Sequence, residues 1–438
     1  MVSQEYEVTN MKFTELNLAE PLQRAIDDLD FTELTDVQAT ALPITLAGQD
    51  VAGQGRTGTG KTATFLITTI NRLLTQPPKQ GRGVKHPRAL IIAPTRELVV
   101  QISDDAKKLV RHTDLKLHTV FGGVDYEKQR LAFDDGVDIL IGTPGRLIDY
   151  LKKGCYSLSL CEMLVIDEAD RMFDLGFIKD LRFMMRRLPK YTERQSLMFS
   201  ATLAHRVLEL AYDHMNDPVK LRAEEGSLTA DGIVESMYHT AMEEKFPLLI
   251  HLLRDQNVER GMIFINQKRT GEKVARNLAR YGFAVGILSG DVRQKKRMRI
   301  LEDFSAGKLH LLVATDVASR GLHIDGVTHV FNYDLPDDAE NYVHRIGRTA
   351  RAGAKGTAIS FACEHFCFGV PDIEAYIKRP IPLHRIEVEW LDIGKPTAPG
   401  AVAEGLGRED REQPRPNDKK SGGRRPGGGG NNRNRGRR

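Results

Sequence analysis

The 438-residue chain has little cysteine and no long apolar stretch. Its four cysteines, Cys155, Cys161, Cys363 and Cys367, include no C-x-x-C pair, so neither a disulfide scaffold nor a zinc site is indicated, and we expect thiols in a reducing compartment. No apolar run approaches the roughly 18 residues that a membrane span needs. The polar, acidic start MVSQEYEVTN is not typical of a secretory signal. The sequence therefore predicts a soluble, cytoplasmic protein without a membrane partner.

Acidic residues are missing from one end of the chain. Residues 419–438 hold eight Lys or Arg and no Asp or Glu, and because the whole chain has a formal net charge of +4, the rest sums to −4. After Trp390 the chain becomes rich in Pro and Gly, and then in Arg, Gly and Asn. A segment of this composition cannot bury enough apolar surface to offset the entropy of ordering it. We expect residues 393–438 to be a disordered basic tail.

The body of the chain alternates short apolar runs with helix-length segments. Such runs are typical of parallel strands that helices cover on both faces. One polar stretch, RAEEGSLTADG at 222–232, has no apolar periodicity and reads as a linker between two α/β domains. A loop rich in Pro and Gly at 76–87 reads as a surface excursion. The expected strands are residues 89–93, 137–141, 163–166, 197–199, 262–265, 285–288, 309–314, 327–331 and 357–361.

A glycine-rich stretch at residues 55–62, GRTGTGKT, fits the pattern G-x-x-x-x-G-K-[ST]. In this pattern backbone N–H groups surround phosphate oxygens at the N-terminus of the helix that follows. Lys61 would reach the β- and γ-phosphates, and the Thr62 hydroxyl would bind Mg²⁺. The alternative is a glycine-rich surface turn. The residues predicted to line this ATP site are Gly55, Arg56, Thr57, Gly58, Thr59, Gly60, Lys61 and Thr62.

Further along the chain, an apolar run ends in two carboxylates. Residues 163–166, MLVI, lead directly into Asp167 and Glu168. In a P-loop ATPase, Asp167 would bind Mg²⁺ through water, and Glu168 would orient or deprotonate the attacking water. Acidic residues at a strand end can also be simple helix N-caps. Together with the lysine loop, however, this pair indicates an ATPase.

These two motifs belong to a longer series that resembles the DEAD-box RNA helicases. Residues 167–170 read DEAD, and the other motifs follow in the family's order over roughly residues 11–390. A series in fixed order is far more specific than any single motif. The further motifs are FTELTDVQ at 31–38, PTREL at 94–98, GG at 122–123, TPGR at 143–146, SAT at 200–202, MIFIN at 262–266, QKKR at 294–297, TDVASRG at 315–321 and HRIGRTAR at 344–351.

The resemblance implies an α/β fold of two RecA-like domains, each a mostly parallel sheet flanked by helices. Residues 1–222 would contain an N-terminal extension, the Q motif and the first domain, and residues 233–392 the second domain. Residues 223–232 would be the linker and residues 393–438 the disordered tail. ATP and RNA would both bridge the cleft between the domains, so that hydrolysis would release their closure.

The resemblance also assigns roles around ATP. Gln38 would read the adenine edge and Phe13 would stack on the ring. Arg348 and Arg351 would reach the γ-phosphate from the second domain. With these two arginines, the expected catalytic set is completed by Lys61, Asp167 and Glu168. Coupling between the domains is expected of Asp170, Ser200, Thr202 and His344.

RNA is expected to lie across both domains, held by its sugar-phosphate backbone. Such contacts position a strand without reading its sequence, and few aromatic residues accompany the motifs, so no base-stacking platform is indicated. The resemblance therefore implies sequence-independent binding. The residues expected to hold RNA are Thr95, Arg96, Gly123, Thr143 and Arg146 in the first domain, and Arg297 and Thr315 in the second.

Two positions depart from the family's pattern. His323 stands where most members have an Asp that is implicated in binding the ribose; a neutral imidazole can still hydrogen-bond a hydroxyl. Ala350 stands where the family usually has Gly, and it would be strained if the backbone there needed a positive φ. Both departures bear on how the site binds the nucleotide.

The resulting hypothesis is an RNA-stimulated ATPase that separates short duplexes locally and acts as a monomer. The alternative is an ATP-gated RNA clamp or annealing chaperone that hardly unwinds. Residues 174–180, 321–324 and 332–338 resemble most a bacterial subfamily of the degradosome, which implies a role in RNA degradation and an endoribonuclease scaffold as partner. The basic tail would tether RNA, although a solubilising tail or one that meets an acidic protein surface remains open.

Overall fold

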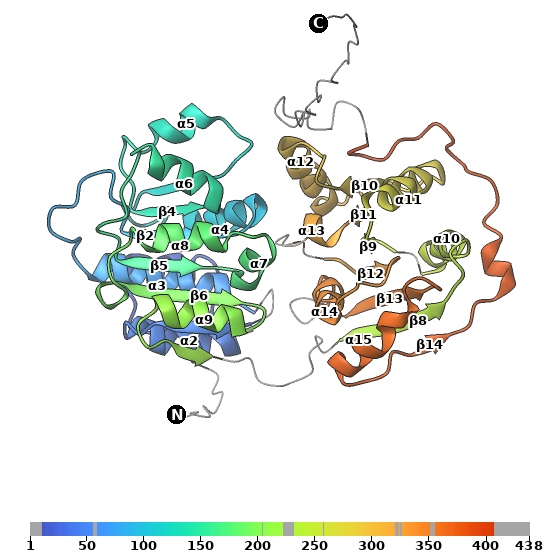
Figure 1. Ribbon diagram of the computed structural model, residues 1–438, viewed down its shortest axis with the longest axis horizontal. Coiled ribbons are helices and arrows are strands. Elements are labelled where there is room, and N and C mark those ends of the chain that lie inside the picture. Colours follow the sequence, from blue (N-terminus) through green and yellow to red (C-terminus); the bar gives the residue numbers. More distant parts are fainter. Residues whose placement is uncertain are drawn as a thin grey trace, which may run out of the picture.

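The computed structural model describes residues 11–55, 59–203, 205–221, 232–256, 258–319, 324, 326–350 and 355–406. These residues form two seven-stranded sheets of parallel strands, and helices cover both faces of each sheet (Figure 1). The predicted α/β architecture of two parallel sheets flanked by helices is therefore confirmed. The predicted linker at 223–232 lies outside the described residues except for Gly232, and the tail beyond residue 406 lies outside them too.

The first sheet has the strand order β3-β4-β2-β5-β6-β1-β7. Its strands are β1 (Val51–Gln54), β2 (Ala89–Ile92), β3 (Leu117–Val120), β4 (Ile139–Gly142), β5 (Met163–Ile166), β6 (Gln195–Ser200) and β7 (Val219–Leu221). Its helices are α1 (Glu20–Asp27), α2 (Asp36–Leu46), α3 (Lys61–Thr75), α4 (Arg96–Leu109), α5 (Tyr126–Leu131), α6 (Pro144–Lys152), α7 (Ala169–Asp174), α8 (Ile178–Met185) and α9 (His205–His214).

The second sheet has the order β10-β11-β9-β12-β13-β8-β14. Its strands are β8 (Ile233–His239), β9 (Gly261–Phe264), β10 (Val285–Leu288), β11 (Leu311–Ala314), β12 (His329–Asn332), β13 (Gly356–Ala362) and β14 (Leu383–His384). Its helices are α10 (Lys245–Asp255), α11 (Lys268–Arg280), α12 (Gln294–Ser305), α13 (Asp316–Ser319), α14 (Ala339–Ile346) and α15 (Val370–Ile377).

Strands β2, β4, β5, β9 and β11 are apolar throughout, and both of their faces are buried. Along β2, Ala89 and Ile91 belong to one hydrophobic cluster, and Leu90 and Ile92 belong to the cluster on the other face. Each of the nine predicted apolar runs overlaps a strand, as expected for a sheet between two helical layers. Among the described residues no helix is long and apolar enough to cross a membrane, and all four cysteines are free thiols.

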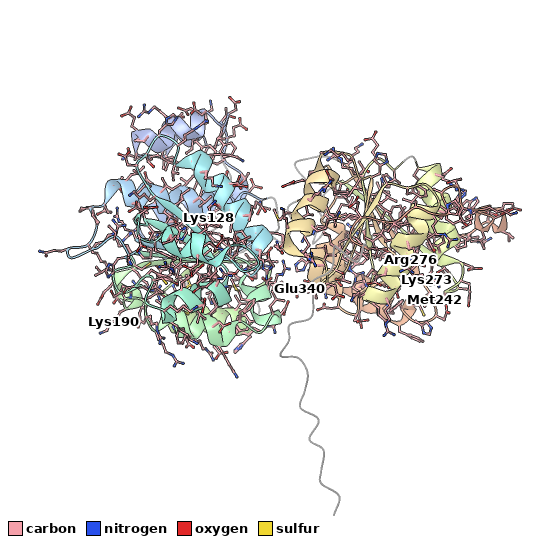
Figure 2. All side chains as sticks on the ribbon, turned by 90° about the horizontal axis from the view of Figure 1, so that it is seen from above. Lys128, Lys190, Met242, Lys273, Arg276 and Glu340 are labelled. Atoms are coloured by element: carbon pink, nitrogen blue, oxygen red, sulfur yellow. The ribbon has the colours of Figure 1, made fainter. Side chains whose placement is uncertain are left out.

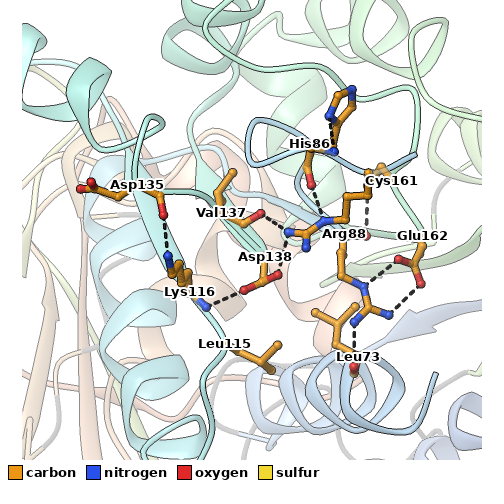
Figure 3. Close-up of polar contacts among 12 residues, drawn as sticks. Leu73, His86, Arg88, Leu115, Lys116, Asp135, Val137, Asp138, Cys161 and Glu162 are labelled. Carbon is orange, nitrogen blue, oxygen red and sulfur yellow. Dashed lines mark hydrogen bonds and ion pairs between the residues drawn. The ribbon is translucent and has the colours of Figure 1, made fainter. Parts of the chain in front are cut away.

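The loop at 76–87 is held at the amino-terminal edge of the first sheet (Figure 3). Arg82 donates to the Asp138 carboxylate and to the Val137 carbonyl, both at 2.7 Å. Next to it, the buried Arg88 guanidinium forms a two-pronged ion pair with Glu162 at 2.7 and 3.0 Å. Because parallel strands place the phosphate loop at the opposite edge, this loop lies away from the predicted site.

The predicted start of the disordered tail at residue 393 is wrong. Residues 393–406, which we call the C-terminal strap, pack on the second domain and end beside β10. The Glu404 N–H donates to the Val285 carbonyl at 3.0 Å, and the Ile287 N–H donates to the Glu404 carbonyl at 2.9 Å. Ala403 is 3% exposed. The open edge of β10 supplies hydrogen bonds that the composition of the strap does not reveal.

Candidate active site at the facing edges of the two sheets

The phosphate loop joins β1 to the N-terminus of α3. Gly60 precedes the helix with φ of +88°, and a Cβ there would lie 2.6 Å from the Gln38 side-chain nitrogen, so a glycine is required. The Lys61 ammonium donates to the Gly55 carbonyl. Of the residues predicted to line the ATP site, the structure describes Gly55, Thr59, Gly60, Lys61 and Thr62, whereas Arg56, Thr57 and Gly58 lie outside the described residues.

The Q-motif residues brace this loop. Thr35 caps α2, and its hydroxyl donates to the Thr59 carbonyl at 2.9 Å. The Gln38 side chain accepts from the Thr35 N–H at 2.9 Å and donates to the Gly60 carbonyl at 3.4 Å. Both ends of the Gln38 amide thus contact the protein backbone. Adenine recognition by Gln38 stays a prediction.

Phe13 lies deeper than its expected role suggests. Its ring is 2% exposed and belongs to the core of the first domain. It stacks on Phe31 with ring centroids 5.8 Å apart, and Phe31 is 40% exposed. Phe31, which begins the Q motif, was not among the predicted site residues. Stacking of adenine on Phe13 remains a prediction, and Phe31 is the accessible ring of the pair.

The two adjacent carboxylates follow β5. Asp167 is 3% exposed, and its carboxylate accepts from the Glu168 N–H at 2.9 Å. Burial, the neighbouring Glu168 charge and, more weakly, Asp170 raise the pKa of Asp167 to about 7, while the Lys61 ammonium opposes the shift. Glu168 has φ of +50°, a left-handed backbone that is uncommon outside glycine. The Glu168 carboxylate accepts from Arg171 at 3.1 Å.

The structure brings Asp170 together with the segment 200–202. The Asp170 N–H donates to the Ser200 hydroxyl at 3.1 Å, and the Asp170 carboxylate accepts from the N–H groups of Ala201 and Thr202 at 3.1 and 3.2 Å. The start of α7 and the end of β6 are therefore linked inside the first domain, and coupling of Asp170, Ser200 and Thr202 to the second domain stays a prediction.

Glu340, on α14 of the second domain, lies where the two halves of the molecule meet (Figure 2). Burial and the nearby Asp170 raise the pKa of Glu340, and a hydrogen bond with Thr202 opposes the rise. The expected coupling residue His344 lies one turn further along α14, with its Nε2 atom 4.0 Å from the Glu340 carboxylate. Glu340 was missed because a lone Glu in a helix has no motif of its own.

The arginines expected at the γ-phosphate follow α14. Arg348 is buried, and its Nε atom donates to the His344 carbonyl at 3.3 Å. Arg351 lies outside the described residues, as does His323. Ala350 has φ of +54°. The backbone at position 350, where the family usually has Gly, therefore has the positive φ that strains an alanine.

In the first domain, the predicted RNA residues occupy three adjacent strand ends. Thr95 caps α4 and accepts from the Leu98 N–H at 3.4 Å. The next residue, Arg96, packs over Gly123, which has φ of +84°. Thr143 precedes α6, and on that helix the Arg146 guanidinium lies 5.0 Å from the Tyr126 ring centroid. These residues share the carboxyl-terminal edge of the sheet with the phosphate site.

Two predicted RNA residues, Arg96 of the first domain and Arg297 of the second, join a polar cluster between the domains. Arg297 of α12 forms a 2.8 Å ion pair with Glu97 of α4, and Gln294 accepts from Arg96 at 3.4 Å. Burial favours the neutral form of Glu97, but the Arg297 charge and hydrogen bonds lower its pKa overall. The seventh predicted RNA residue, Thr315, accepts from the Ala318 N–H at the start of α13. Glu97 and Gln294 were not singled out from the sequence.

Two family models match the chain: DEAD/DEAH box helicase over residues 35–210, and helicase conserved C-terminal domain over residues 244–353. The chain is 51% identical to the ATP-dependent RNA helicase RhlB of Xanthomonas campestris pv. campestris strain B100, over 95% of this chain and 75% of that protein. It is 49% identical to RhlB of Shewanella piezotolerans, over 88% of this chain and 89% of that protein.

Solved structures show the same fold. A structure of S. cerevisiae Dbp5 bound to RNA and ADP BeF3 matches with a TM-score of 0.76 and 30% identity, over 86% of this chain and 95% of that one. The match spans both sheets. The two-sheet arrangement is therefore shared with a protein whose structure holds both a nucleotide and RNA.

Proposed function

This chain belongs to the DEAD-box family of ATP-hydrolysing RNA helicases, and we propose that it uses ATP to separate short RNA duplexes locally, without reading their sequence. The observation that carries the proposal is the convergence of two sets of residues. Lys61, Asp167 and Glu168 follow the carboxyl ends of β1 and β5, the first-domain RNA candidates follow neighbouring strand ends of the same sheet, and polar contacts such as Arg297 with Glu97 join this edge to the second domain.

We assign the chemistry of ATP hydrolysis to the residues around Lys61. The Lys61 ammonium binds the phosphates, and Glu168 orients the attacking water. The Thr62 hydroxyl and the buried Asp167 carboxylate are oxygen ligands of the kind that Mg²⁺ prefers. Burial and Glu168 raise the pKa of Asp167, and a bound cation would favour its ionised form. When bound, Mg²⁺ would neutralise charge on the phosphates. Arg348 and Arg351 would stabilise the transferring phosphoryl group from the second domain.

For RNA, we propose contacts with the sugar-phosphate backbone from both domains, which carry no sequence information. Thr95, Arg96, Gly123, Thr143 and Arg146 would supply them on one side, and Arg297 and Thr315 on the other. Arg297 is engaged by Glu97 in this structure, so RNA would share or replace that contact. From the likeness to RhlB, we further propose a role in RNA degradation with an endoribonuclease scaffold as partner.

The test is steady-state ATP hydrolysis by the purified protein, alone, with single-stranded RNA and with single-stranded DNA, followed by separation of a short RNA duplex. We expect stimulation by RNA only. Lys61→Ala and Glu168→Gln should each reduce turnover by a factor of about 100 or more, and Glu168→Gln should still bind ATP and RNA. Lys107→Ala is the matched control, because Lys107 lies exposed on α4 in an ion pair with Asp104.

Each outcome separates one function from another. Stimulated hydrolysis without strand separation would replace the helicase by an ATP-gated RNA clamp. Equal stimulation by DNA would contradict the preference for RNA. Full turnover in either variant would contradict the role of that residue.

A further inference from the structure

Arg171 immediately follows the DEAD segment and is almost fully buried. Its guanidinium donates from one terminal nitrogen, Nη1, to the Glu168 carboxylate at 3.1 Å, and the residue is 5% exposed. Glu168 itself is the left-handed residue that precedes α7. The ion pair therefore joins Arg171 to Glu168, the residue proposed to orient the attacking water.

A purely stabilising role explains this pair poorly. Removing two charges from water costs free energy that their attraction often only balances, so a buried ion pair is weak evidence for stability. A strained backbone at Glu168 adds a further cost. Positioning explains both features, because a planar guanidinium fixes the direction of the carboxylate that it binds.

The other terminal nitrogen of Arg171, Nη2, reaches the second domain. It donates to the Val317 carbonyl at 3.5 Å, the long end of the hydrogen-bond range. Val317 lies on α13, and Figure 1 shows α7 and α13 facing each other between the two sheets. One side chain thus contacts the predicted catalytic carboxylate and the opposite domain.

Helix α13 lies next to a predicted RNA contact and contacts α14, the helix that precedes the predicted γ-phosphate arginines. It begins directly after Thr315, a predicted RNA contact. Its Asp316 carboxylate accepts two hydrogen bonds from the buried Arg345 of α14, both at 2.6 Å. Since α14 leads into Arg348, a shift of α13 would move the predicted RNA contact and the γ-phosphate arginine together.

We propose that Arg171 is a positioning residue that links the Glu168 carboxylate to α13, so that hydrolysis proceeds when RNA has drawn the second domain into place. The long bond to Val317 shortens as the domains close, and the guanidinium then holds Glu168 in its working orientation. When the domains part, that second anchor is lost. This inference rests on the proposed RNA-stimulated ATPase and names the residue that couples its two halves.

The test compares Arg171→Ala, Arg171→Lys and the control Arg206→Ala in steady-state hydrolysis, with and without single-stranded RNA. Lysine keeps the charge beside Glu168 but lacks the fork that reaches both partners. Arg206 makes an exposed ion pair with Asp174, at the other end of α7. The melting temperature and the affinity for a labelled RNA with ADP and beryllium fluoride complete the set.

For both Arg171 variants we expect kcat with RNA to fall about tenfold or more, with KM for ATP changed less than about twofold. The ratio of RNA-stimulated to RNA-free turnover should fall as well, while Arg206→Ala matches the wild type. Wild-type stimulation in Arg171→Ala would overturn the proposal. So would full recovery by Arg171→Lys, or an equal loss of both rates with a lowered melting temperature, since these indicate charge or stability alone. A wild type that RNA does not stimulate would instead contradict the proposed function, and the inference with it.

Discussion

Burial of Asp167 makes the ionised form of its carboxylate unfavourable in the folded protein. It is almost fully buried, and burial and Glu168 together raise its pKa from 3.8 to about 7. The folded protein therefore binds an extra proton between about pH 4 and pH 7. The stability that this proton contributes is complete below the ordinary pKa and is lost as the pH rises through 7. A bound cation would reverse this cost by pairing with the ionised form.

The first prediction concerns Asp167→Asn in magnesium-free buffer. The amide cannot ionise, so the variant should gain stability over the wild type as the pH rises from 5 to 8, by about 2 kcal/mol at the upper end. Urea unfolding at each pH measures the difference. Asp104→Asn, at an exposed carboxylate of the same domain, is the control. A difference that does not depend on pH would contradict the raised pKa.

The second prediction concerns the strained Ala350. Its φ of +54° suits glycine, so Ala350→Gly should raise the stability of the second domain by about 0.5 to 1 kcal/mol. Equilibrium unfolding in urea would measure it, with Ala306→Gly as a matched control at a residue that is not left-handed. Loss of stability at position 350 would show that its methyl group is worth more than the relief of strain.

Among the structural elements, the C-terminal strap has the clearest consequence. It covers the open edge of β10 with backbone hydrogen bonds, and Lys296 of α12 forms an ion pair with Glu404. Since α12 also carries Gln294 and Arg297, the strap supports the helix that contacts the first domain. The described residues end at Leu406, beside β10.

The third prediction separates the strap from the tail by two truncations. Ending the chain after residue 406 should leave the melting temperature unchanged, whereas ending it after residue 392 should lower it by about 3 °C or more, because an apolar edge is uncovered. Both should weaken RNA binding. If all eight cations at 419–438 meet phosphates, the slope of log affinity against log salt becomes shallower by up to about 5.6. Equal melting of the two truncations would contradict the role of the strap.

The whole molecule depends on how its two sheets meet. Glu97 and Arg297 form a largely buried ion pair between the domains, with Arg96 and Gln294 beside it. Breaking such a pair by removing one partner is costly, since the remaining charge stays desolvated. The closed arrangement should therefore be sensitive to this contact, whereas the interior of each domain should not.

The fourth prediction is that Glu97→Ala shifts the two domains apart. With fluorescent labels on the domains, the ratio of close to separated molecules should fall about tenfold, with no change in the unfolding of either domain. The exchanged pair Glu97→Arg with Arg297→Glu should recover part of the shift and serves as the control. An unchanged ratio in Glu97→Ala would mean that other contacts hold the domains.

Much of the fold could be predicted because its signals are local. A strand that helices cover on both faces is an unbroken apolar run, so β2, β4, β5 and their counterparts could be recognised from neighbouring residues alone. Strand β8 escaped recognition because Glu235 interrupts its run. That carboxylate is stabilised by the Tyr342 hydroxyl at 2.7 Å, from a residue far along the chain.

The position of the candidate site could also be predicted, since its motifs are short and their order is specific: Lys61 begins α3 after its glycine loop, and Asp167 and Glu168 follow β5. The chemical roles of these residues stay predictions. The partners of these residues were not readable. These contacts join residues that are distant in sequence or belong to different elements. They include the stacking of Phe13 on Phe31, the contacts of Arg171 with Glu168 and Val317, the pairing of Glu97 with Arg297 and the packing of the strap beside β10. Residue types and spacing state which chemistry is available, but packing and the relative placement of the two sheets determine which groups meet.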